Sequence, residues 1–443
     1  MKNKKAAQEQ TIIPALLLLL LLIISTSRYA THATLADTTI DTIPVDNAPN
    51  GIAFDPLNDD LYVANFETGT VSVISGAANS LVATVNLNMP ESPWEVAFDP
   101  LNGLVYISDT YSGYISVING TSNAIVATAL VGGPEDHMNG IAYDYSNDEI
   151  YVVDMVAELL ISINCSSNAV AAEANLGGVQ QPWDVVYDPV NQGLYVTNLG
   201  SNSVSLINGT TNGLVAIIPV GINPNSAAVD MVPGPNYGDV FVTNYASDSI
   251  SVIGRSTNTV IQNISVIGNP KSIVFDQENG NFYVADPGSD TISVINGSDD
   301  SLLGYAQAGQ VPNELALDTL NQNLYVTNFS YGTVTVISTN NMTLTSSATT
   351  VRPSVTVSST SSEITASSTI SKSNPTTNAT TPTSTDTVSS QSQEPASGSN
   401  SSYSQNTDSV SRTSGRTIIA SVVVVAVAFS VTALLLARRQ LVR

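Results

Sequence analysis

The chain has 443 residues, of which 42% are hydrophobic and 11% charged, and its formal net charge is −24 at pH 7. Only two of its 13 Lys and Arg residues, Arg255 and Lys271, fall within residues 34–348. The strong negative charge of residues 34–348 disfavours nucleic acid and phosphate-rich partners, because binding these partners depends on Lys and Arg. Cations, basic partners and neutral sugars remain as ligand classes.

The N-terminus is typical of a secretory signal. Lys2, Lys4 and Lys5 precede the apolar run "TIIPALLLLLLLII" (11–24), and small residues follow in "YATHA" (29–33). We expect cleavage to remove residues 1–33. An uncleaved anchor is the alternative, although the run is short for a bilayer span.

Residues 34–348 contain a repeated motif. Near-copies of "GLYVTN" (193–198) recur, and each repeat also has an apolar run that ends at an aspartate, then a turn, then a run such as "TVSVI" and a closing run such as "SLVATVNL". The aspartate recurs at intervals of 42 to 46 residues, at Asp55, Asp99, Asp144, Asp188, Asp230, Asp276 and Asp318. Four short strands in a repeat of this length predict a β-propeller blade. The sequence therefore predicts an all-β, seven-bladed β-propeller of four-stranded blades.

The segment before the first repeat and the third repeat both differ from the common pattern. The segment "TIPVDNAPN" (42–50) precedes the first blade and matches "IIPVGINPN" (217–225), which leads from one blade to the next. We expect this N-terminal strand to pair beside Val336 and close the ring, which removes free sheet edges. The third repeat has "AELLISINCS" (157–166) where the others have a polar turn and "TVSVI", so we expect an irregular blade there.

The C-terminal segments predict a displayed, membrane-anchored protein. Residues 349–416 are rich in Ser and Thr with few large apolar side chains, which predicts a disordered stalk. Residues 417–437 form an apolar run long enough for a transmembrane helix, and the basic residues in 438–443 favour a cytoplasmic tail. A cleaved lipid-anchor signal is disfavoured by that basic end.

The repeats resemble those of the YVTN-repeat β-propeller family, which is found in archaeal and bacterial surface-layer and secreted proteins. The resemblance covers residues 34–348 and is carried by motifs such as "GIAFDP" (51–56) and "GLYVTN" (193–198). It implies the propeller fold and leaves the function open, because propellers serve binding, scaffolding and catalysis.

One face of the predicted ring gathers candidate ligands. In a four-stranded meander, the entry loop of the first strand and the turn after the second strand open on the same face. Carboxylates on that face suit a Ca²⁺ or Mg²⁺ site, and the predicted ligands are Glu95, Asp109, Asp154, Asp184, Asp286 and Glu314. The alternative is that the Asn and Asp residues merely form turns, because their side chains bond to turn backbone.

Trp94, Trp183, His137 and Asn139 lie in entry loops on the same face and are predicted to bind a ligand. An indole beside carboxylates and amides can stack on a sugar or clamp a peptide, or it can simply pack over a blade junction. His137 is the only histidine beyond the signal region, and no GxSxG, HExxH or CxxCH motif occurs. We therefore do not expect an enzyme.

The opposite face carries the turns after the third strands. Glycosylation sequons cluster in or near these turns, with acceptors at Asn119, Asn164, Asn208, Asn296 and Asn341. The sequon at Asn164 includes Cys165, the only cysteine, so the chain forms no intrachain disulfide.

Three functions remain open from the sequence. The first is a non-catalytic surface protein that displays its propeller on a stalk to bind a protein, a glycan or a cation, in adhesion or recognition. The second is a structural component of a surface layer. The third is a metal-dependent lactonase or lyase, an activity known among propellers that resemble this one. We favour the first, because signal, stalk, anchor and sequons all serve display.

Overall fold

The computed structural model describes residues 35, 38–87 and 92–342. The predicted signal peptide (1–33), stalk (349–416), transmembrane helix (417–437) and tail (438–443) lie outside these residues. Within the described part of the chain, no helix is long and apolar enough to cross a membrane.

Seven antiparallel sheets of four strands make up the described chain, as predicted. Blades 1 to 3 comprise β2 (Pro49–Asp55), β3 (Asp60–Asn65), β4 (Thr70–Ser75) and β5 (Ser80–Asn86); β6 (Ser92–Asp99), β7 (Leu104–Thr110), β8 (Tyr114–Asn119) and β9 (Ala124–Leu130); and β10 (Met138–Asp144), β11 (Glu149–Asp154), β12 (Leu159–Asn164) and β13 (Ala169–Asn175). Blades 4 to 6 comprise β14 (Pro182–Asp188), β15 (Gly193–Asn198), β16 (Ser203–Asn208) and β17 (Gly213–Pro219); β18 (Pro224–Val229), β19 (Val240–Asn244), β20 (Ser249–Gly254) and β21 (Thr259–Ser265); and β22 (Ile273–Asp276), β23 (Asn281–Asp286), β24 (Thr291–Asn296) and β25 (Ser301–Gln307). Blade 7 comprises β26 (Pro312–Asp318), β27 (Asn323–Asn328), β28 (Thr333–Ser338) and the N-terminal β1 (Thr39–Pro44); two short 3-10 turns are η1 (Tyr245–Ser247) and η2 (Thr339–Asn341).

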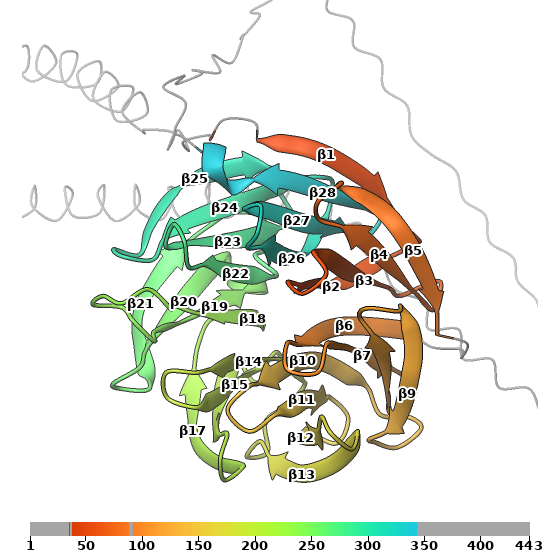
Figure 1. Ribbon diagram of the computed structural model, residues 1–443. Helices are drawn as coiled ribbons and strands as arrows, with labels where there is room; N and C mark the ends of the chain where they lie inside the picture. Colours follow the sequence, from red (N-terminus) through yellow and green to blue (C-terminus); the bar gives the residue numbers. More distant parts are fainter. Residues whose placement is uncertain (1–34, 36–37, 88–91, 343–443) are drawn as a thin grey trace, which may run out of the picture. The chain divides into compact units, whose positions relative to one another are not determined.

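The blades form a closed ring. Their first strands contact one another in the circular order β2, β6, β10, β14, β18, β22, β26 and back to β2. Figure 1 shows these strands around the centre and the fourth strands at the rim. The first strand of each blade therefore places its residues nearest the ring axis.

Ring closure occurs through the N-terminal strand, as predicted. β1 pairs antiparallel with β28, with Asp41 opposite Val336 and Ile43 opposite Val334. The first strand of the chain thus completes the sheet that contains the last one. Both ends of the array are tied together, and the edge of β28 is covered.

The hydrophobic core lies between neighbouring blades. One cluster joins Val73 of blade 1 to Val105 of blade 2, and another joins Val63 of blade 1 to Val334 of blade 7. The second and third strands are rich in Val and Ile and are mostly buried, because both of their faces are covered by adjacent sheets. Each blade is therefore stable only between its neighbours.

The tyrosine of the repeated motif ties each of several blades to the next. The Tyr62 hydroxyl donates to the backbone oxygen of Gly120 and to Asn123 Oδ1, both at 2.8 Å. Equivalent hydroxyls of Tyr106, Tyr151 and Tyr325 also bond to the turn after the third strand of the following blade. A buried hydroxyl thus bridges two sheets at a repeated place.

Blade 3 is regular in its pairing, so the expectation of an irregular blade was wrong. Asp154 lies opposite Leu159, just as Asn65 lies opposite Thr70 in blade 1. The difference is in side chains: Ser162 takes a position held by Val73 in blade 1, and its buried Oγ has no hydrogen-bond partner among the described residues. Register follows from turn length, which the third repeat keeps.

Candidate functional site

Four charged side chains approach the ring axis. They are Glu95, Asp184, Glu314 and Lys271, here called the axial cluster, and each belongs to a first strand or to the loop that enters it. All four are half-buried. Glu314 raises the pKa of both Glu95 and Asp184, Asp184 raises that of Glu95, and Lys271 interacts electrostatically with Glu95 and Glu314. Among the described residues at the axis, three acids thus face one amine.

The repeat explains why these carboxylates point to the axis. Glu95, Asp184 and Glu314 each stand four residues before the aspartate that ends the first strand. The corresponding residue in blades 1 and 3 is glycine: a Cβ on Gly51 would lie 2.6 Å from Glu95 Oε2, and one on Gly140 would lie 2.6 Å from Asp184 Oδ1. The backbone of the neighbouring first strand is at least as close to these glycines, so the strand and carboxylate of Glu95 and of Asp184 occupy the space that a side chain would fill.

Hydroxyl groups fix the backbone beneath the acids. The Ser108 Oγ accepts a hydrogen bond from the Glu95 N–H at 3.0 Å and donates to the backbone oxygen of Asn139, in the next blade, at 2.6 Å. Thr197 and Thr327 make the same pair of bonds for Asp184 and Glu314. Each acid is thus held by a hydroxyl that also connects two blades.

The environment of the axial cluster disfavours charge. Burial raises the pKa of Glu95 well above its ordinary value, and the charges of Glu314 and Asp184 raise it further, while Lys271 opposes them. Burial and then Glu314 raise the pKa of Asp184 to about 7. Burial lowers the pKa of Lys271, although Glu314 and Glu95 act against this. A bound cation would relieve the repulsion among the acids.

Lys271 is held at one side of the cluster. Its Nζ donates to Asn313 Oδ1 and lies 6.0 Å from the centre of the Trp94 ring. Asn313 in turn donates to Asn50 Oδ1 at 2.8 Å, and Asn50 donates to the Trp94 backbone oxygen at 2.8 Å. The amine is therefore part of a hydrogen-bonded chain that runs between blades 6, 7, 1 and 2.

Aromatic side chains gather beside the axial cluster. Trp94 of blade 2 and Trp183 of blade 4 meet edge to face with ring centres 5.7 Å apart, although blade 3 separates their sheets. Phe66 contacts Trp94 at 5.4 Å. We call Phe66, Trp94 and Trp183 the aromatic cap; all three are half-buried. Both tryptophans directly precede an axial acid in the chain, so the cap adjoins the charges.

The two other predicted ligand residues differ in their surroundings. His137 is half-buried and packs edge to face against Tyr111, with ring centres 4.3 Å apart; burial lowers its pKa. Tyr111 also contacts Phe66 of the cap, at 6.3 Å. Asn139 is 3% exposed, and its amide bonds to Thr110 and Met155. His137 thus extends the aromatic surface, whereas Asn139 serves packing between strands.

The six predicted metal ligands do not form one cluster, so that part of the prediction needs correction. Glu95, Asp184 and Glu314 share the axis, but Asp154 and Asp286 end second strands, Asp109 is the last residue but one of its second strand, and all three are buried in their own blades. Asp109 Oδ2 accepts from Ser116 at 2.9 Å, Asp286 Oδ2 accepts from Ser293 at 2.6 Å, and Asp154 Oδ1 accepts two backbone N–H groups. Asn residues at the same position bond to Ser or Thr pairs of the third strand, as Asn65 does.

The residues at the ends of the second strands thus agree with the alternative interpretation, in which their side chains form local hydrogen bonds and bind no ligand. No three of the six predicted acids bring carboxylate oxygens within 4.8 Å of one another among the residues described. Calcium binding by the remaining axial acids stays a prediction. The arrangement there, with a lysine and an aromatic cap, suits an organic cation as well.

The predicted glycosylation sites lie where expected in the fold. Asn119, Asn164, Asn208 and Asn296 end the third strands of their blades and are half-buried, and each Oδ1 accepts hydrogen bonds within the following turn. Asn341 lies in η2. Modification of these asparagines stays a prediction.

No protein-family model matches the chain, and no curated protein matches it. Among solved structures, a chain of the hydrazine synthase of Kuenenia stuttgartiensis is similar, with a TM-score of 0.54 and 16% identity. The similarity covers 66% of this chain and 96% of that chain. At this identity the likeness shows the propeller fold alone.

Proposed function

We propose that the protein is a non-catalytic, cell-surface propeller of the YVTN-repeat type that binds a cationic group of a partner at the axial cluster. The observation that carries this proposal is the combination of three acids and one amine at the ring axis with an adjoining aromatic cap. Carboxylates attract a cation, and aromatic faces bind ammonium or guanidinium groups by cation–π interaction. The strongly acidic body would also steer a basic partner toward the ring.

The proposed ligand is an exposed Lys or Arg side chain of a neighbouring surface protein. An arginine guanidinium offers several donors to carboxylates and a flat face to indole rings. The carboxylates of the axial acids provide acceptors for it, and a repeat hydroxyl holds the backbone of each acid. The predicted signal, stalk and membrane anchor support the same proposal, because they would present the ring outside the cell.

A calorimetric titration with methylguanidinium, butylammonium and calcium chloride tests the proposal. We expect saturable binding of the organic cations at one site, weakened at least about tenfold in the double variant Glu95→Gln and Glu314→Gln, since a lost charge-assisted bond costs about 1.5–3 kcal/mol. Glu67→Gln is the control, because Glu67 is exposed and follows Phe66 of the cap. Absent or unchanged binding in the double variant would refute an axial site; saturation by calcium alone would favour an inorganic ion instead.

The surface-layer alternative rests on the same charges and makes a different prediction. A lattice bridged by divalent cations would assemble laterally when calcium is added. Light scattering of the purified protein with and without calcium would distinguish such assembly from binding of a single partner side chain.

A further inference from the structure

The second notable cluster lies between blades 2 and 3, at the end of the first strand of blade 2. Cys165 stands in the turn after β12, where four other blades have glycine: Gly76, Gly120, Gly209 and Gly297. A Cβ on Gly120 would lie 2.6 Å from Asp55 Oδ2, and one on Gly209 would lie 3.1 Å from Asp144 Oδ2. At this position a side chain must therefore face the closing aspartate of the preceding blade. In blade 3 that side chain is a thiol, and the facing residue is Asp99.

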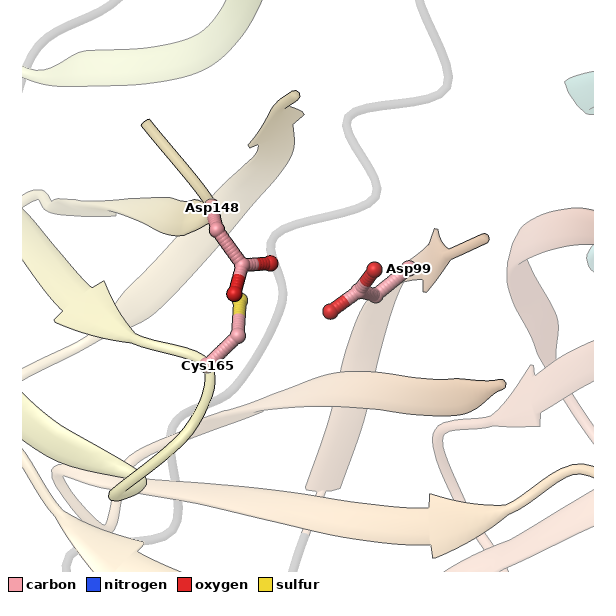
Figure 2. A group of neighbouring side chains, drawn as sticks. All are labelled: Asp99, Asp148 and Cys165. Carbon is pink, nitrogen blue, oxygen red and sulfur yellow. The ribbon is translucent and has the colours of Figure 1, made fainter. Parts of the chain in front are cut away.

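Three potential metal ligands converge there. One oxygen of Asp99, one oxygen of Asp148 and the sulfur of Cys165 all lie within 4.8 Å of one another. Figure 2 shows the sulfur beside the Asp148 carboxylate, with the Asp99 carboxylate facing both. Asp99 is fully buried, Cys165 is 2% exposed and Asp148 is half-buried. The Tyr143 hydroxyl donates to Asp148 Oδ1 at 3.2 Å and adds a fourth candidate ligand atom nearby.

Asp99 also offers a buried carboxylate oxygen that lacks a hydrogen-bond donor in the described part of the chain. Asp99 Oδ1 accepts the Leu101 N–H at 2.8 Å, but Oδ2 is buried and has no hydrogen-bond partner among the described residues. The equivalent oxygens of Asp144, Asp188 and Asp318 are likewise buried without a partner among the described residues, whereas in blade 1 that of Asp55 accepts from Asn58 at 2.8 Å. The corresponding Asn102 of blade 2 instead uses its Oδ1 to accept the Leu104 N–H. A buried carboxylate oxygen without a donor is costly, and a cation would satisfy it.

The interface between blades 7 and 1 provides an internal comparison. There Asp318 and Asp59 take the places of Asp99 and Asp148, and Gly76 takes the place of Cys165. Asp318 Oδ2 and Asp59 Oδ1 are likewise buried and unpartnered within the described chain. The two interfaces therefore share a pair of acids, and only the one between blades 2 and 3 adds sulfur.

We propose that Asp99, Asp148 and Cys165 bind a thiophilic divalent cation of the Zn²⁺ class between blades 2 and 3. Zinc accepts one thiolate together with carboxylate oxygens in a tetrahedral shell, and the Tyr143 hydroxyl or a water would supply the fourth ligand. Calcium and magnesium prefer shells made of oxygen alone, so sulfur selects against them. The ion would join two neighbouring sheets.

Binding carries a proton balance. A thiol has an ordinary pKa of about 8.5, so without a cation it carries its proton at neutral pH. On binding, the S–H bond breaks, the sulfur lone pair forms the bond to the metal and the proton leaves to solvent. Metal affinity should therefore fall as the pH is lowered.

Titration of the purified, full-length chain with Zn²⁺ and with Co²⁺ tests the proposal. We expect one equivalent of either ion to bind, with a sulfur-to-cobalt charge-transfer band in the near ultraviolet and a rise of the melting temperature with Zn²⁺. Cys165 is the only cysteine, so any such band reports this site alone.

Two variants complete the test. Cys165→Gly restores the residue that four other blades use, and it should abolish both the band and the Zn²⁺-dependent rise of the melting temperature. Asp59→Asn alters the acid pair that lacks sulfur and should leave both unchanged. The proposal is wrong if the unaltered chain shows no thiolate band, or if Zn²⁺ raises the melting temperature of Cys165→Gly as much as that of the unaltered chain.

Discussion

Removal of one bridging hydroxyl, in the variant Tyr62→Phe, is expected to destabilise the ring. The Tyr62 side chain is fully buried, and its hydroxyl donates across the interface between blades 1 and 2 to Gly120 O and Asn123 Oδ1. Phenylalanine keeps the packing of the ring but leaves both acceptors without this donor. A buried acceptor that loses its partner costs about 1–3 kcal/mol, which is the expected loss of unfolding free energy.

Blade 5 shows how the chain itself replaces this bond. Phe241 stands at the tyrosine position, and Asn236 Nδ2 instead donates to Gly297 O at 2.9 Å and to Asp300 Oδ1 at 2.8 Å. A phenylalanine is thus accommodated where another donor reaches the same acceptors. No such donor substitutes for Tyr62 in the described part of blade 1.

Urea unfolding at equilibrium, together with melting curves, measures the effect. In domains of 150–250 residues, each kcal/mol of lost unfolding free energy lowers the melting temperature by about 2–4 °C. The control is Tyr195→Phe, because the Tyr195 hydroxyl accepts from Asn191 within its own blade at 2.8 Å. The control should cost less than Tyr62→Phe, and an equal or larger loss in Tyr195→Phe would refute the bridging role.

Three further predictions concern ring closure, acidity and the axis. Deletion of residues 34–46 removes β1 and should lower the melting temperature of the whole ring, whereas an unchanged melting temperature would contradict closure by that strand. The pKa of Asp184 is raised to about 7 and that of Asp286 to about 8, each chiefly by burial. Both pKa values lie above the ordinary aspartate pKa of about 3.9, so the folded state binds more protons than the unfolded state. The stability gained from this protonation is fully present below about pH 3.9 and is lost as the pH rises through about 7 and 8. Melting temperatures should therefore fall between pH 5 and pH 9, less steeply in Asp286→Asn; a flat or rising profile would contradict these shifts. Gly140→Ala should displace both the Asp184 carboxylate and its backbone, because an added Cβ would lie 2.6 Å from Asp184 Oδ1 and 2.4 Å from its Cα. It should therefore weaken cation binding and also lower the melting temperature, which calorimetry and melting curves measure.

The fold was predictable because its signal is repeated. Seven aspartates at nearly constant spacing mark the ends of first strands. A strand that is hard to recognise in one repeat can therefore be identified from the other six repeats. The N-terminal strand could be placed because 42–50 copies the sequence at 217–225. The expectation for blade 3 failed since it relied on side-chain pattern, whereas pairing register depends on the lengths of turns.

The site was predicted only in part, because strand position decides where a side chain points. Glu95, Asp184 and Glu314 lie four residues before the closing aspartates and reach the axis. Asp109 and Asp286 lie in the last two residues of their second strands, and each accepts a hydrogen bond from a serine hydroxyl of its own third strand.

Lys271 and Phe66 were missed, although counting positions could have found them. Lys271 takes the same repeat position as Trp94 and Trp183, directly before the axial residue. Phe66 follows the Asn that ends a second strand, on the predicted binding face. Contacts between blades 2 and 4, in contrast, depend on the closed ring and are not visible in any single repeat.

Intrinsic fluorescence gives the most direct test of the central claim that the ring axis binds a cationic group. Trp94 and Trp183 are the only tryptophans in the chain, and both belong to the aromatic cap, so their emission reports this site alone. Titration of the purified protein with an arginine-containing peptide should change the emission saturably, and more strongly above pH 7, where Asp184 is ionised. The same peptide with citrulline in place of arginine should have no effect. An emission that stays constant with arginine, or that responds equally to citrulline, would contradict the account.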